Sequence, residues 1–108
     1  MTQVNWDAVL GQAANAARAA VGEKWPLVSR AAAQQISLLI ANAAFIEENA
    51  GEMTELEYKL VTKNQQRAFE SVLTGFEAIS IVLAEQAFEA AWGVIAGALR
   101  TATGLAFI

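Results

Sequence analysis

Residues 47–57 read Glu-Glu-Asn-Ala-Gly-Glu-Met-Thr-Glu-Leu-Glu, and this stretch contains the clearest boundary in the chain. Gly51 interrupts a helical pattern, because glycine is a poor helix former and favours helix ends. Thr54 with Glu57 three residues later forms a capping-box pattern, which is typical of a helix N-terminus. The stretch therefore predicts a turn between a helix that ends near residue 50 and a helix that begins at residue 54.

Two helices are predicted before this turn. Over residues 26–50, apolar positions step by three or four residues along one face, and Pro26 stands in the first turn, where proline is tolerated. Over residues 4–22, Asn5 suits the N-cap and Gly22 the C-cap. The contact face of this first helix is nearly all alanine. Since small side chains let a neighbouring backbone approach closely, we expect this helix to pack tightly against another.

The segment after the turn keeps helical spacing almost to the end of the chain. Projection at about 100° per residue places its charged residues in one sector, which favours one long helix over 54–103, bent at Gly75. The alternative is a division near 74–76, where Thr74-Gly75-Phe76-Glu77 is a second capping-box pattern. The charged residues in that sector are Arg67, Glu70, Glu77, Glu85, Glu89 and Arg100.

The predicted fold is thus a single all-α domain over residues 1–108. We favour an antiparallel bundle of three helices with a long third helix, and a four-helix bundle is the alternative. A length of 108 residues suits one domain, and 24 alanines with a single proline agree with an all-helical chain. Apolar residues make up 56% of the chain, which is high for a small monomer with a polar surface. Some of that apolar surface is therefore expected to meet a partner.

Several classes of function are disfavoured by composition. The chain contains no histidine and no cysteine, which removes the commonest general base, the commonest transition-metal ligand and all thiolate chemistry. We therefore expect no enzymatic activity, no catalytic residue, no metal and no cofactor. A net charge of −4 argues against binding nucleic acid, since phosphate backbones attract clustered Lys and Arg.

Three charged clusters have an ordinary structural explanation. The acidic run from Glu47 to Glu57 spans a turn and lacks the spacing of a calcium-binding loop, so we interpret it as solvated. The basic residues at 59, 63 and 67 lie at four-residue intervals and suit an exposed helix face, with docking of an acidic partner helix as the alternative. Glu85 and Glu89 are expected at an outer edge, not as a buried pair.

The carboxy-terminal region has a pattern that suits close helix packing. Gly93 and Gly97 form a G-x-x-x-G motif, and residues 90–108 contain one charged side chain, Arg100, over a length that could cross a bilayer. Arg100 falls near the centre of that window, where a charge costs about 2.5 to 3.5 kcal/mol. A membrane-spanning segment is therefore the second choice.

We accordingly expect a non-catalytic structural or interaction protein that forms a homo-oligomer or joins a larger protein assembly. The alternative is a membrane-active or membrane-inserted small helical protein, such as a virion or lysis component. No signal peptide is evident in residues 1–7, so a cytoplasmic or assembly-associated location is expected, with a membrane location under the alternative. The residues expected to contact a partner are Ala13, Ala17, Ala20, Phe76, Ile79, Leu83, Ala90, Gly93, Val94 and Gly97.

Overall fold

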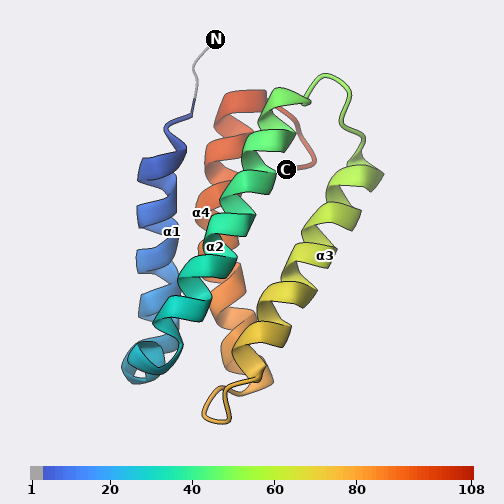
Figure 1. The fold of residues 1–108 in the computed structure, drawn as a ribbon. Coiled ribbons are helices and arrows are strands. Elements are labelled where there is room, and N and C mark those ends of the chain that lie inside the picture. The colour runs from blue at the N-terminus through green and yellow to red at the C-terminus, as the bar shows by residue number, and fades with distance from the viewer. Residues whose placement is uncertain (1–3) are drawn as a thin grey trace.

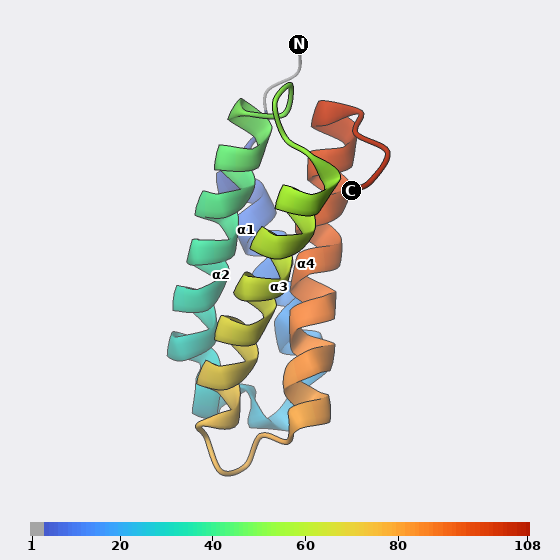
Figure 2. The same cartoon turned by 90° about the vertical axis from the view of Figure 1, so that its right-hand side faces the viewer.

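The computed structural model describes residues 4–108, and every regular element in that part of the chain is a helix. The elements are α1 (Trp6–Val21), the short 3-10 helix η1 (Gly22–Lys24), α2 (Trp25–Glu48), α3 (Glu55–Thr74) and α4 (Ile81–Thr103). Successive α-helices run in opposite directions along one common axis (Figures 1 and 2). The prediction of an all-helical chain is confirmed.

The sequence marks both ends of α1 and the beginning of α2, whereas α2 ends at Glu48, two residues before the predicted end. The Asn5 side chain caps α1 by accepting a hydrogen bond from the backbone N–H of Ala8. Gly22 ends α1 with a φ of 69°, in the left-handed range that glycine enters at no steric cost. Pro26 lies in the first turn of α2, as predicted.

The turn between α2 and α3 carries the predicted cap. The hydroxyl of Thr54 accepts a hydrogen bond from the backbone N–H of Glu57 across 3.1 Å, and it donates one to Glu57 Oε1 across 3.0 Å. The carboxylate thus bonds to the hydroxyl of the capping residue, whereas in the usual capping box it reaches the backbone N–H of that residue. The position of this helix start is confirmed.

The prediction of one long helix over 54–103 is wrong. Helix α3 ends at Thr74, residues 75–80 reverse the chain, and α4 returns beside α3 (Figure 2). The Thr74 hydroxyl donates back to the carbonyl of Glu70 across 2.7 Å, and the following backbone N–H groups bond three residues back, which tightens the end of the helix. The side chain of Ser80, not that of Thr74, caps the next helix by accepting from the backbone N–H of Leu83.

Helix α4 is the central element of the fold. It contacts each of the other three helices, and its most extensive contact is with α1. Ala13 and Ala17 of α1 and Ala84 and Ala91 of α4 are 0% exposed. Because these side chains are small, α1 and α4 pack closely, and the predicted tight packing of the alanine face is confirmed.

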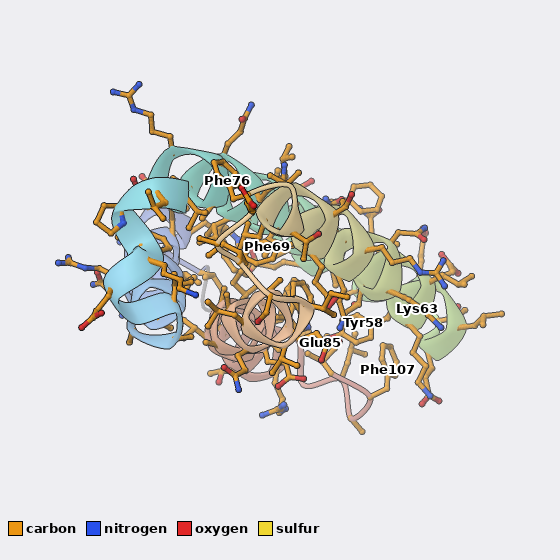
Figure 3. All side chains as sticks on the ribbon, turned by 90° about the horizontal axis from the view of Figure 1, so that it is seen from below. Tyr58, Lys63, Phe69, Phe76, Glu85 and Phe107 are labelled. Atoms are coloured by element: carbon orange, nitrogen blue, oxygen red, sulfur yellow. The ribbon has the colours of Figure 1, made fainter. Side chains whose placement is uncertain are left out.

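Helix α3 completes the core mainly through aromatic side chains. Phe69 meets Phe88 of α4 edge to face, with ring centroids 5.7 Å apart. Tyr58 lies 6.4 Å from Trp92 and 5.7 Å from Phe107, which belongs to the segment after α4. Figure 3 shows Phe69 between the helices and Tyr58 beside Phe107. Large rings therefore fill the wider space between α3 and α4.

Candidate interaction surface

Among residues 4–108, seven large apolar side chains remain on the surface after the core is complete. Each is between 50% and 69% exposed, although residues of this kind are usually buried. The accessible surface of the chain is 6351 Å², compared with about 5,800 Å² expected for a compact monomer of its mass. The seven residues are Leu27, Leu38, Phe45, Leu56, Leu60, Ile81 and Val82.

Three of these residues lie on one flank of α2. Leu27, Leu38 and Phe45, together with the small or polar residues between them, step by four and three residues alternately along the helix. An alternating spacing of three and four is the pattern by which two helices pair along a seam. The core stripe of α2 lies on a different face and contains Val28 and Ile36. We call this flank the α2 seam, and its members are Leu27, Ala31, Gln34, Leu38, Ala41 and Phe45.

A hollow adjoins each end of the α2 seam. One, of about 420 Å³, lies where α2 begins, and its lining includes Leu27, Ala31 and Phe76. The other, of about 150 Å³, lies where α2 ends, and its lining includes Phe45 and Met53. Both hollows are open to solvent, so the side chain of a partner could enter them.

Three of the predicted partner contacts lie inside the chain's own core. Ala13, Ala17 and Ile79 are all at most 4% exposed. They pack within the chain, so they are covered without a partner. The sequence predicted that these positions are covered, but the covering helix belongs to the same molecule.

The remaining predicted contacts lie nearer the surface, and four of them, Leu83, Ala90, Val94 and Gly97, share one face of α4 by their spacing of seven, four and three residues. Gly93 is exposed, and a Cβ atom built at Gly93 or at Gly97 would meet nothing within 4 Å. Within this chain, the G-x-x-x-G motif therefore brings no neighbouring backbone close. Val94 and Gly97 line a hollow of about 340 Å³ beside α1. The partly exposed members of the set are Ala20, Phe76, Leu83, Ala90, Val94 and Gly97.

Individual residues of the acidic run make different contacts. Glu47 accepts hydrogen bonds from the start of the chain's first helix, Glu55 pairs with Lys59 across 3.1 Å, and Glu57 takes part in the cap with Thr54. Residues 4–108 contain no group of three or more His, Cys, Asp or Glu side chains that could hold a metal ion. Three of its five members thus have a structural role, and the other two, Glu48 and Glu52, are exposed.

The other charged residues named in the sequence are exposed, except Glu70, which is partly buried and accepts a hydrogen bond from Gln66. Glu85 and Glu89 lie on the outer side of α4, and Lys63 and Arg67 on that of α3, with Lys63 at the periphery in Figure 3. An exposed pair such as Lys59 with Glu55 contributes only about 0.3–0.5 kcal/mol. These residues therefore place charge on the surface without forming a buried site.

Helix α4 is also the candidate for a membrane span. Within the described residues it alone is long and apolar enough to cross a bilayer, by length and composition. One face of it is buried among the other helices, including Ala87, Ile95 and Leu99 at 0% exposure. The core helix of a bundle would show the same composition.

No protein-family model, curated protein or solved structure matches this chain. The surface itself is therefore the basis for a function. Sequence analysis did not single out Leu27, Leu38 or Phe45. Their alternating spacing was visible in the sequence, beside the stronger stripe of core positions on the same helix.

Proposed function

We propose that this chain is a non-catalytic structural or interaction protein that self-associates through the apolar helix faces its own core leaves uncovered. The observation that carries the proposal is the set of seven large apolar side chains that are at least half exposed. Monomeric proteins bury most residues of this size, and clustered exposure of them is typical of an interaction surface. The absence of histidine and cysteine from the sequence supports a role without catalysis.

The free energies of burial and of association favour an interface that covers several of these residues together. Burying one large apolar side chain fully contributes about 1.5–3 kcal/mol, so completing the burial of a half-exposed one contributes roughly 1 kcal/mol. Association costs about 4–15 kcal/mol in lost translational and rotational freedom. A single contact is therefore too weak, and we expect the copies to join through a continuous strip of the surface.

The proposal is tested by the molar mass of the purified chain. Size-exclusion chromatography with light scattering, without detergent and over a wide range of loading concentrations, should give a mass that rises above 11.5 kDa as the concentration increases. A mass of 11.5 kDa at every concentration up to the millimolar range would overturn self-association.

A second candidate function is membrane insertion through α4, and the length and composition of that helix favour it. Insertion would require α4 to leave the three helices that it now contacts. That change would expose the apolar core of the bundle to water, which opposes it. Flotation with phospholipid vesicles tests this alternative, because chain that stays entirely in the aqueous fraction would exclude it.

A further inference from the structure

We infer that the α2 seam pairs with the α2 seam of a second copy of this chain, with the two helices antiparallel. This inference rests on the proposed self-association and names the surface that performs it. The seam spans about 27 Å from Leu27 to Phe45, since each residue of a helix adds about 1.5 Å. None of its six positions carries a charge.

The spacing of the seam is the first argument. Its members follow one another at intervals of four, three, four, three and four residues, which keeps one helix flank in contact with a neighbouring helix over the whole length. A helix with only one apolar stripe would leave this flank polar. Here α2 has a core stripe that includes Ile36 and Leu39, and an exposed seam that includes Leu38 and Phe45. The second stripe has no covering element within the described part of the chain.

Self-complementarity of the seam is the second argument. In an antiparallel pair centred at residue 36, Leu27 of one copy meets Phe45 of the other, and Ala31 meets Ala41. The alanine layers allow the backbones to approach, and the large side chains fill the two ends. On either side of the centre Gln34 of one copy meets Leu38 of the other, which places a polar amide in an apolar seam at some cost in stability.

Charge complementarity selects the antiparallel orientation. Residues 22–30, at the beginning of α2, contain Lys24 and Arg30 with one acid, while residues 46–54, at its end, contain three acids and no base. Antiparallel pairing places the basic end of one copy beside the acidic end of the other. Parallel pairing would place like charges together, which disfavours that arrangement.

The hollow at the beginning of α2 supports the same arrangement. Its lining includes Leu27, Ala31 and Phe76, and it lies at the level that Phe45 of the second copy would reach. By two-fold symmetry the contact is made twice, once at each end of the interface. The exposed ring of Phe45 thereby gains apolar neighbours, beside the polar Ser29, Arg30 and Gln34 that also line the hollow.

The area is sufficient for a weak dimer. A strip about 27 Å long and about 20 Å wide, which covers α2 and the adjoining edge of α3, buries roughly 1,000 Å² over both copies. That value is near the lower limit for specific interfaces, so we expect a dimer that dissociates on dilution. A tight dimer would need a larger contact.

A pair of substitutions tests the location of the interface. Leu38 on the seam and Val82 on α4 are 50% and 60% exposed, so lysine at either position should leave the fold intact, as circular dichroism would verify. Val82 precedes the exposed Glu89 by seven residues, so it lies on the outer side of α4, away from α2 and α3. Leu38→Lys should raise the dimer dissociation constant by roughly ten-fold or more, because it places a charge in the interface, and Val82→Lys should leave it nearly unchanged. Equal dissociation constants for the two variants would overturn the seam.

Cross-linking tests the orientation, and the chain has no cysteine of its own. Ala31→Cys mixed with Ala41→Cys should form a disulfide-linked dimer under mild oxidation. Either variant alone should not, because equal positions on antiparallel helices lie about 15 Å apart along the axis, too far for a disulfide. Cross-linking of each variant when it is alone, with no disulfide between positions 31 and 41 in the mixture, would overturn the antiparallel arrangement.

The outcomes separate this inference from the function on which it rests. If the unsubstituted chain remains at 11.5 kDa at all concentrations, self-association and the seam both fail. If it associates and Leu38→Lys associates equally well, only the seam fails, and another apolar face such as the one containing Val82 joins the copies.

Discussion

The indole N–H of Trp6 donates a hydrogen bond to Glu47 Oε1 across 3.0 Å. The backbone N–H of Val4 donates to the other oxygen of the same carboxylate across 3.3 Å. One acidic side chain thus ties the beginning of α1 to the end of α2, 41 residues apart in the sequence. A charged acceptor with two donors makes a stronger contact than a neutral hydrogen bond.

We predict that Glu47→Ala lowers the free energy of unfolding by about 1–2 kcal/mol, because two charge-assisted hydrogen bonds are lost at a partly exposed site. Urea denaturation followed by circular dichroism measures this change. The neighbouring Glu48 is exposed, and Glu48→Ala should change stability by less than about 0.5 kcal/mol. Equal effects of the two substitutions would show that the contact with Trp6 does not stabilise the fold.

Ser80→Ala tests the division of the carboxy-terminal half into two helices. We expect it to destabilise the protein by about 1 kcal/mol, because the Ser80 side chain caps α4. In a continuous helix the same substitution would stabilise by a few tenths of a kcal/mol, since alanine is the better helix former. The sign of the change therefore decides between the two arrangements. Ser71→Ala, at an exposed position within α3, is the matched control and should be neutral or slightly stabilising.

Close packing of α1 on α4 predicts that Ala17→Leu is harmful. Ala17 is 0% exposed, so added carbon atoms must displace its neighbours, at a cost of about 1–3 kcal/mol. Ala19 lies two residues away on the exposed side of α1, and Ala19→Leu should be tolerated. Thermal unfolding of both variants checks this, and a stable Ala17→Leu variant would contradict the close approach of the two helices.

Gly93→Ala tests whether the G-x-x-x-G motif takes part in the contact between copies. A Cβ atom at Gly93 meets nothing within 4 Å, so the substitution should stabilise α4 by about 0.5–1 kcal/mol through its helix propensity. Because the α2 seam lies elsewhere, the dimer dissociation constant should stay the same. A loss of association in this variant would place Gly93 in a close contact between copies.

The helix ends before residue 55 could be predicted from the sequence because local chemistry determines them. Each capping residue acts on backbone groups within a few residues, so its type and position are sufficient to predict the helix end. The capping residues are Asn5, Gly22 and Thr54. The division near residues 74–76 was predicted only as the alternative, and it was placed second for a physical reason. Charged side chains of α3 and α4 share one helical phase in projection by coincidence, although the two helices run in opposite directions.

The sequence predicted that the chain has an interaction surface, but it did not predict which residues form it. Periodicity identified Ala13 and Ala17 as covered positions, but it does not say whether the covering helix is in the same chain or in another. The structure assigns them to the contact between α1 and α4. Leu38 and Phe45 could be recognised as uncovered only after α2 had been packed, because exposure depends on which flank the other helices leave open.

Sedimentation equilibrium of the unsubstituted chain, without detergent and at several loading concentrations, measures directly whether two copies associate. We expect a mass that approaches twice 11.5 kDa as the concentration rises and falls back towards 11.5 kDa on dilution. A single species of 11.5 kDa throughout would contradict it, because the exposed leucine and phenylalanine side chains of α2 would then face water with no partner.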